Sequence, residues 1–172
     1  MTHRDAAGTV VAMHQGDPPF DGGCACGKVR YRVSRAPIFV HGCHCRQCQR
    51  QTGTAFAINA LVEATAVQLQ AGTTEATDVP SPSGAGQRIC RCAACKVALW
   101  SHYLAGGEAI AYVRVGTLDE PGRISPDIHI YTSTKHPVVV LPDGVPAVDE
   151  YYRAKEHWPA ESLARARAAR GG

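Results

Sequence analysis

Eight cysteines in a chain of 172 residues are the side chains best able to do chemistry. They fall into three clusters, which are Cys24 and Cys26, then Cys43, Cys45 and Cys48, then Cys90, Cys92 and Cys95. Cysteines this close in sequence can bring their sulfurs to one tetrahedral metal ion, and zinc is the usual ion for such a set. Because no cluster reaches four ligands alone, at least one zinc must join distant clusters. The pattern therefore predicts a metal ion that is part of the fold.

Disulfides and iron-sulfur clusters are the competing interpretations. Disulfides need an oxidising compartment, and residues 1–16 offer only a short apolar stretch, broken by Gly8, which makes a poor secretory signal. Cysteines one residue apart on an extended strand point to opposite faces and seldom bridge each other. Iron-sulfur sequences usually repeat two-residue gaps between cysteines. Zinc is therefore preferred, and we expect a cytoplasmic protein.

One zinc should be bound by four sulfurs. Cys92 and Cys95 have the spacing of half a zinc knuckle, in which backbone amides of the turn can point at the sulfurs. They need two more thiolates, and Cys24 and Cys26 supply a pair. A zinc with four protein thiolates is closed, so we expect this site to be structural.

The remaining set of three is where chemistry is expected. Cys43, Cys45 and Cys48 would leave one position on zinc for water or substrate. Three thiolates make the ion a weak Lewis acid, better suited to binding a substrate thiol as a nucleophilic thiolate than to making hydroxide. Cys90 is left over, and we expect a small buried residue. In the alternative, Cys90 closes the set of three into a second structural site.

The side chains beside these cysteines could be structural or functional. Arg46 and Arg50 flank the set of three and could hold carboxylates of an anionic thiol. His44 could carry a proton, although a packed or hydrogen-bonded histidine is the commoner outcome. Structural histidines are also favoured at positions 41, 102 and 129, and core packing over a pocket wall is favoured for the aromatic residues Phe56, Trp100 and Tyr103.

Composition bounds the class of protein. The chain is long enough to bury a real core as one domain, and its hydrophobic content of 45% is that of a globular protein. No apolar run approaches the roughly 18 residues of a membrane helix, so no membrane partner is expected. The formal charge of +3 vanishes if seven thiolates bind two zinc ions. Nucleic acid is therefore an improbable partner, with only a local arginine cluster near the C-terminus.

Short segments with β-type patterns recur between turn signals such as Gly22-Gly23 and Pro142-Asp-Gly144. No helix-length pattern separates successive strands, which predicts a mostly β, antiparallel domain. The predicted strands are 28–33, 38–41, 55–62, 67–69, 97–103, 108–115, 128–131 and 138–141.

Three segments depart from this pattern. Residues 1–19 mix Gly, Pro, Asp and His and are expected to be a flexible lead-in. Thr73–Gln87 is expected to be a polar, solvated loop. Glu161–Arg170, preceded by Pro159, predicts a short Ala/Arg-rich helix with a solvated face, a C-terminal appendage.

The cysteine motifs with their neighbours resemble the glutathione-dependent formaldehyde-activating enzyme family, which also includes centromere protein V-type domains. The resemblance covers roughly residues 20 to 152 and rests on three ordered cysteine clusters. The matching runs are Gly22-Gly-Cys-Ala-Cys-Gly27, Val29-Arg-Tyr31, Cys43-His-Cys-Arg-Gln-Cys48 with Gly53, Arg88, Cys92-Ala-Ala-Cys95, Leu99-Trp100, Gly116-Thr-Leu-Asp119 and His129-Ile130.

The resemblance implies a single Mss4-like β domain closed by zinc over 20–152, and it leaves out the predicted helical tail over 153–172. It implies a structural zinc on Cys24, Cys26, Cys92 and Cys95, and a catalytic zinc on Cys43, Cys45 and Cys48. The implied reaction joins glutathione, or a similar thiol, to formaldehyde or a small aldehyde, which is carbon-sulfur lyase chemistry giving S-hydroxymethylglutathione. The alternative is a zinc-stabilised binding module without turnover, because fold does not fix function.

Two positions depart from the family pattern. Lys96 stands where the family usually has Gly after the second cysteine of the knuckle, which questions the geometry of that turn. Val138 stands where an aromatic residue is common, which questions the wall of the substrate pocket.

Overall fold

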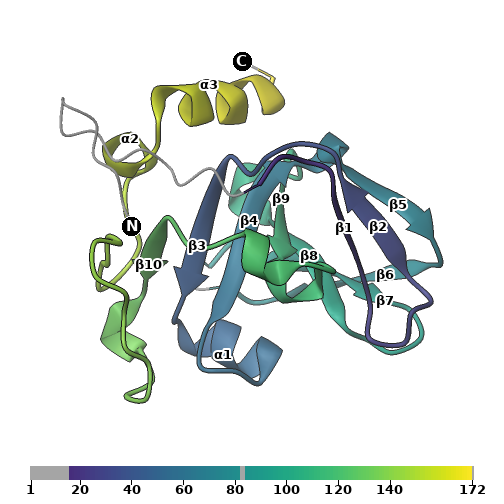
Figure 1. Cartoon of the computed structure of the whole chain (residues 1–172), viewed down its shortest axis with the longest axis horizontal. Coiled ribbons are helices and arrows are strands. Elements are labelled where there is room, and N and C mark those ends of the chain that lie inside the picture. The colour runs from purple at the N-terminus through teal and green to yellow at the C-terminus, as the bar shows by residue number, and fades with distance from the viewer. Residues whose placement is uncertain (1–15, 82–83, 172) are drawn as a thin grey trace.

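The computed structural model describes residues 16–81 and 84–171. Most of the predicted lead-in over 1–19 lies outside the described residues. The chain is mostly β, as predicted, and its strands form two sheets (Figure 1). The small sheet has the strand order β1-β2-β5, and the large sheet has the order β10-β3-β4-β9-β8-β7-β6. The largest hydrophobic core includes residues of both sheets.

The strands are β1 (Phe20–Gly23), β2 (Arg30–Val33), β3 (Phe39–Cys43), β4 (Ala57–Glu63), β5 (Val67–Ala71), β6 (Thr74–Val79), β7 (Gln87–Cys92), β8 (Ala98–Tyr103), β9 (Ile110–Arg114) and β10 (Ile128–Ile130). The α-helices are α1 (Arg46–Thr52), α2 (Ala154–His157) and α3 (Ala160–Ala169).

The expectation of a purely antiparallel domain was wrong at one edge. β10 pairs with β3 in parallel, with Ile128 opposite His41, whereas the other strand pairs are antiparallel. β3 and β10 are far apart in the chain, with strands β4 to β9 between them, so this parallel pair is not a simple strand-helix-strand unit. The carboxylate of Asp127 accepts a hydrogen bond from the Val40 amide at 2.8 Å and fixes the entry to β10.

The predicted loop Thr73–Gln87 was wrong over most of its described length. Residues Thr74–Val79 form β6, which pairs antiparallel with β7. β6 is the outermost strand of the large sheet, and most of its residues are exposed or only partly buried. Its polar sequence is therefore that of an edge strand, where a hydrophobic pattern is not needed.

The predicted strand over 138–141 was also wrong. Val138 is 73% exposed and Val140 is 90% exposed, and the segment forms turns and irregular structure. Pro137 and Pro142 bracket this β-branched run and cannot donate backbone hydrogen bonds to a ladder. Val138 is therefore a surface residue, although an aromatic residue of the substrate pocket is common at this position in the family.

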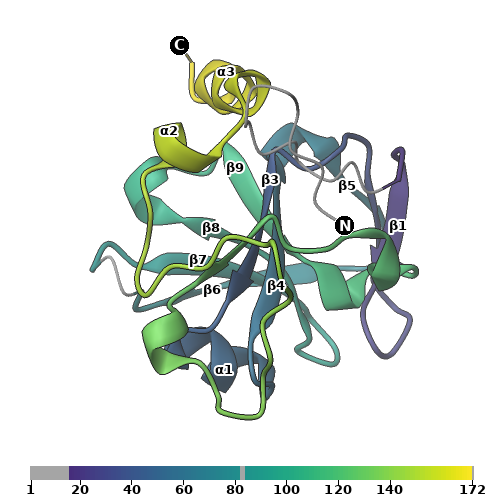
Figure 2. The same ribbon diagram turned by 60° about the vertical axis from the view of Figure 1, so that its left-hand side comes forward.

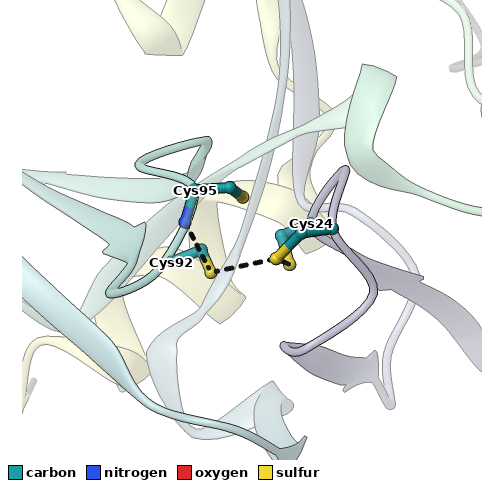
Figure 3. A group of neighbouring side chains, drawn as sticks. Cys24, Cys92 and Cys95 are labelled. Carbon is teal, nitrogen blue, oxygen red and sulfur yellow. Dashed lines mark hydrogen bonds between the residues drawn. The ribbon is translucent and has the colours of Figure 1, made fainter.

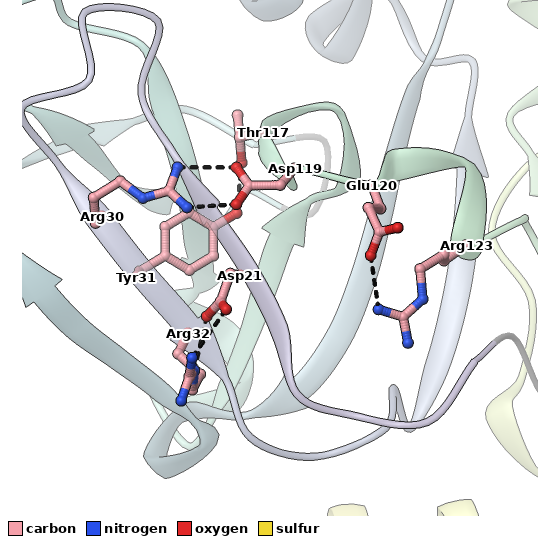
Figure 4. A network of polar contacts seen from close by, with 8 residues as sticks. All are labelled: Asp21, Arg30, Tyr31, Arg32, Thr117, Asp119, Glu120 and Arg123. Carbon is pink, nitrogen blue, oxygen red and sulfur yellow. Dashed lines mark hydrogen bonds and ion pairs between the residues drawn. The ribbon is translucent and has the colours of Figure 1, made fainter.

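The small sheet is tied to the large one by polar side chains (Figure 4). Arg30 on β2 makes a two-pronged ion pair with Asp119, with one contact at 2.9 Å. The Tyr31 hydroxyl hydrogen-bonds to the Thr117 hydroxyl at 2.6 Å, and Thr117 donates to the Arg114 carbonyl at the end of β9. These contacts position the turn after β1, which carries Cys24.

The C-terminal helix was predicted correctly, but it is no loose appendage. α3 lies across one end of β3, β4 and β9, at the opposite end of the molecule from α1 (Figures 1 and 2). Ala166 packs with Ile38, Leu61 and Ile110 in a small core, and the Ser162 hydroxyl donates to the Ile38 carbonyl at 2.6 Å. Within the described residues, no helix is long and apolar enough to cross a membrane.

Candidate metal centres

Four sulfurs meet where the turn after β1 approaches the end of β7, and Figure 3 labels Cys24, Cys92 and Cys95 of this group. The sulfurs of Cys24, Cys26, Cys92 and Cys95 all lie within 4.8 Å of one another. The separations are 3.4 Å from Cys24 to Cys26 and 3.9 Å from Cys26 to Cys92. Zn–S bonds of about 2.3 Å at tetrahedral angles place sulfurs roughly 3.8 Å apart. The donor set and its spacing therefore fit a zinc ion.

Two similar turns deliver these four cysteines. In the first turn, the Cys24 amide donates to the Val29 carbonyl at 3.1 Å and Gly27 has a φ of +75°. In the second turn, the Cys92 amide donates to the Val97 carbonyl at 3.0 Å and Lys96 has a φ of +63°. Lys96 thus adopts the left-handed conformation that favours glycine, so the departure from the family pattern leaves the turn intact at a cost of about 1 kcal/mol.

Backbone amides in these turns point at the sulfurs. The Val29 amide donates to the Cys24 sulfur at 3.2 Å, and the Cys95 amide donates to the Cys92 sulfur at 3.5 Å. The hydrogen bond from Val29 is the main reason that the pKa of Cys24 falls to about 6. Because metal-bound cysteine is a thiolate, amides that favour the charged form also favour metal binding.

The second group of sulfurs lies at the junction between β3 and α1. The sulfurs of Cys43, Cys45 and Cys48 are within 4.8 Å of one another, and all three residues are buried. Cys43 ends β3, Cys45 is the N-cap of α1, and Cys48 lies in its first turn. The Cys48 amide donates to the Cys45 sulfur at 3.3 Å, so one side chain both caps the helix and joins the sulfur group. We call these three residues the triad.

The protonation of the triad explains why it suits a cation. The pKa of Cys45 is lowered because Cys43 and Cys48 donate hydrogen bonds to its thiolate. The pKa of Cys43 is raised far above its usual range, first because it is the donor to Cys45. One thiolate is therefore stabilised at the expense of its neighbours, and a divalent cation would let all three lose their protons. The donor set fits zinc with one open position.

The other cysteine lies apart. Cys90 is on β7 opposite Trp100 and belongs to neither of the two sulfur groups. Burial is the main cause that raises its pKa, which keeps it a neutral thiol. The alternative in which Cys90 closes the triad therefore finds no support in the geometry.

The histidines near the triad are packed and hydrogen-bonded, as expected for His44, but Nδ1 of His44 and Nε2 of His129 have no hydrogen-bond partner among the described residues. His44 is fully buried, stacks on Phe56 with ring centroids 4.9 Å apart, and shares a hydrogen bond of 2.9 Å with His129. Burial lowers the pKa of His44 to about 4, so it is neutral at physiological pH. His102 hydrogen-bonds to the Ile110 carbonyl at 3.0 Å. Trp100 packs against Tyr31, again as expected for a core residue.

A cavity of about 410 Å³ opens beside the triad. Tyr103 lines it, contrary to the expectation that this tyrosine only packs in the core. Tyr131 also lines it and has a φ of +57°, an uncommon conformation that non-glycine residues often adopt at functional sites. Sequence reasoning missed most of this lining, which includes His41, Ile110, Tyr112, Ile130, Tyr151 and Arg170.

The predicted arginines are not in this cavity. Arg46 and Arg50 are exposed on α1, and Arg46 donates to Gln49 at 3.1 Å. Neither residue lines the cavity, so the hypothesis that they hold substrate carboxylates finds no support in this cavity. The reason is helical geometry, because Cys48 occupies the buried face of this short helix and both arginines fall on its outer face.

Arg114 is a further residue that the sequence did not single out. It is buried on β9, donates to Asn59 on β4, and donates to Gln51 on α1 at 3.1 Å. Asn59 lines the cavity with Cys43 and Cys45. Arg114 therefore braces the helix of the triad against the wall of the cavity.

Residues 19–134 match the family described as glutathione-dependent formaldehyde-activating enzyme. The chain belongs to this family. The match spans both sulfur groups, and it ends before Tyr151 and Arg170. These two residues of the cavity wall therefore lie outside the part of the chain that the family model matches.

Comparisons with curated proteins and with solved structures add little to the family assignment. No curated protein matches the chain. A crystal structure of a Rhodobacter sphaeroides protein from structural genomics is similar at 19% identity and a TM-score of 0.45, over 62% of this chain and 91% of that chain. So distant a likeness carries no argument about the site. The functional interpretation rests on the family and on the residues of this chain.

Proposed function

We propose that this protein joins a thiol, glutathione or a similar one, to formaldehyde or another small aldehyde, as a zinc-dependent carbon-sulfur lyase. The observation that carries the proposal is the buried triad, which has three sulfurs, fits a metal ion and opens into a cavity through Cys43 and Cys45. The family's description names glutathione and formaldehyde, which supports this reaction. The alternative of a binding module with two closed sites needs an eighth ligand, and Cys90 lies away from the triad.

Each sulfur group has its own part in the proposal. Cys24, Cys26, Cys92 and Cys95 would hold a structural zinc, and Cys43, Cys45 and Cys48 would hold the zinc that serves the reaction. Zinc at the triad would supply a position where a substrate thiol is held without its proton. The reacting sulfur forms a bond to the aldehyde carbon, the C=O π pair moves to oxygen, and the thiol proton ends on that oxygen. No oxidant or reductant is needed.

The residues around the triad prepare this step. The Cys45 cap and the Cys48 amide fix the ligands on one rigid junction, and His44 packs neutral beside them. The cavity beside them gives the substrate and the hydroxymethyl product a mostly apolar surrounding. Metal binding by both groups would require reduced thiols, which suits the cytoplasmic location that is part of the proposal.

The test is the rate of exchange between isotope-labelled formaldehyde and its glutathione adduct, measured by NMR, because thiols add to formaldehyde unaided. The zinc-loaded protein should accelerate exchange above the rate without protein. Cys45→Ala should return exchange to that uncatalysed rate, and Cys90→Ala should keep the acceleration. If the zinc-loaded parent protein leaves the exchange rate unchanged, the enzyme proposal is wrong and the binding module remains.

A further inference from the structure

The cavity beside the triad has a composition of its own. Its wall is made mostly of aromatic and aliphatic side chains, with Cys43 and Cys45 at one place in it. The lining residues that matter here are Tyr103, Tyr112, Tyr131, Tyr151, Ile110 and Ile130. Small-molecule sites of this size and apolar character bind ligands with apolar or aromatic bodies, and a few polar groups set the orientation. The wall thus favours an apolar body over a peptide backbone.

One lining residue carries a permanent charge among those that the structure describes, and it is Arg170. His41 is neutral there because complete burial lowers its pKa to about 3, and it hydrogen-bonds to the Tyr152 hydroxyl at 2.5 Å. The Arg170 guanidinium lies near Gly106. Its Nη2 atom is 3.8 Å from the position that a Cβ atom on Gly106 would occupy. Burial raises the pKa values of Tyr112 and Tyr151, and the positive charge of Arg170 lowers them in part. Arg170 is therefore beside the aromatic wall.

Arg170 has no carboxylate partner in the part of the chain that the structure describes. Within residues 16–81 and 84–171, no ion pair of Arg170 occurs, whereas Arg30, Arg32 and Arg88 each pair with aspartate. A guanidinium at the edge of an apolar cavity is a ready donor for a carboxylate, which it can bind through two parallel N–H bonds. The cavity therefore offers one anion-binding position, at some distance in the fold from the helix of the triad.

The helix that carries Arg170 is fixed in place. Arg165 makes a two-pronged ion pair with Glu63 on β4, with contacts of 3.0 and 2.8 Å, and the two side chains are only 18% and 7% exposed. Arg165 also donates to the Ala36 carbonyl at 2.8 Å. α3 is thus anchored to the sheet one turn before Arg170. Arg170 is the C-cap residue directly after this anchored helix, which holds it in a defined position, as a specificity residue requires.

We propose that the substrate thiol of this protein has an apolar, aromatic-compatible body and a single carboxylate, and that Arg170 binds this carboxylate and determines specificity. The inference rests on the proposed function, because it places the substrate sulfur at the triad. Glutathione fits this cavity less well, since it carries carboxylates at both ends of a polar peptide body. The cavity offers one cation, and Arg46 and Arg50 lie outside it.

The test compares ligands on the zinc-loaded full chain by oxygen-free equilibrium dialysis. The probes are para-carboxybenzyl mercaptan, benzyl mercaptan, glutathione and the sulfur-free para-toluate. We expect carboxybenzyl mercaptan to bind about tenfold more tightly than benzyl mercaptan, because one charge-assisted hydrogen bond at an exposed position contributes roughly that much affinity. We also expect it to bind more tightly than glutathione.

Variants of α3 assign the effect to one residue. Arg170→Gln should remove the tenfold advantage of the carboxylate and leave benzyl mercaptan unchanged, and Arg170→Lys should keep part of it. Arg167→Gln is the matched control, because Arg167 is exposed in the last turn of the same helix and does not line the cavity. Thermal melts of the variants confirm that the helix remains folded.

Two results would overturn the inference. In the first, Arg170→Gln weakens the carboxylated and neutral thiols equally; in the second, glutathione binds the parent protein at least as tightly as carboxybenzyl mercaptan. Failure of the proposed function gives a different pattern. In that case para-toluate binds as well as carboxybenzyl mercaptan and Cys45→Ala affects neither, while the dependence of both on Arg170 persists.

Discussion

The two sulfur groups use the same ligand type but are built in opposite ways. The four-cysteine group joins two turns whose facing cysteines, Cys26 and Cys92, are 66 residues apart in sequence. The triad is contained within six residues at one junction between a strand and a helix. Ligands drawn from distant segments make a metal part of the tertiary fold, whereas ligands from one local junction leave most of the fold independent of it. The comparison teaches that the sequence separation of the ligands matches the structural and reactive roles that we propose for the two groups.

The sharpest way to break this comparison is to remove a ligand from the four-cysteine group. Cys92→Ala should destabilise the whole domain by several kcal/mol, because structural zinc sites contribute binding free energy on the order of 10 kcal/mol to folding. A thermal melt of the zinc-loaded protein measures the effect. Cys24→Ala, on the other turn, should behave in the same way. If either variant melts within about two degrees of the parent, the group does not hold the fold together.

Removal of a ligand from the triad should have the opposite signature. Cys45→Ala should lose one zinc ion and the reaction while retaining its circular dichroism signal, at a cost of about 1 kcal/mol for the lost cap of α1. Metal analysis and a chemical denaturation curve test it together. Collapse of the β-sheet signal would show that the triad is structural, and the contrast between the two groups would disappear.

A cysteine outside both groups calibrates these effects. Cys90→Ala should keep both metal ions and cost about 1 kcal/mol, as expected for trimming a small, partly buried side chain. Zinc stoichiometry under a mild chelator challenge, compared with Cys45→Ala, provides the measurement. Equal loss of one ion in both variants would make Cys90 a ligand and the triad a closed site.

The smallest effect distinguishes the two turns of the four-cysteine group. Lys96→Gly should stabilise the domain by about 0.5 kcal/mol, because relief of the left-handed backbone outweighs loss of the exposed Lys96–Glu75 ion pair. Gly27→Ala at the matching position should destabilise it by about 1 kcal/mol. Chemical denaturation should show changes of opposite sign. A destabilising Lys96→Gly would mean that the ion pair matters more than the backbone.

The sulfur groups could be predicted from the sequence, because the short spacing of the cysteines within each cluster does not depend on how the rest of the chain folds. The cores of β8 and β9 were predictable from apolar patterning for the same reason. β6 was missed since an edge strand needs no hydrophobic face, and its residues Thr74 to Val79 are mostly polar. α1 was missed since it buries only Cys48 and thus has no apolar periodicity.

The cavity could not be predicted, because its wall gathers residues that are far apart in the chain. Tyr112 and Arg170 meet only after α3 docks on β4, and nothing near Arg170 in sequence signals that docking. Glu63 was the available clue, because a carboxylate in a mostly apolar strand requires a cationic partner from elsewhere. The arginines beside the triad drew attention instead, although local helix geometry turns them away.

The separation of Cys26 from Cys92 also has a consequence during synthesis. The triad is complete once residue 48 has left the ribosome, so it can take up metal while most of the chain is still being made. The four-cysteine group must wait for its second turn, and its first pair of thiols stays reduced and unpaired through that interval. Contacts so distant in sequence form late, since the intervening chain must be ordered first. We therefore expect the reactive metal to bind an unfinished chain and the structural metal to complete it.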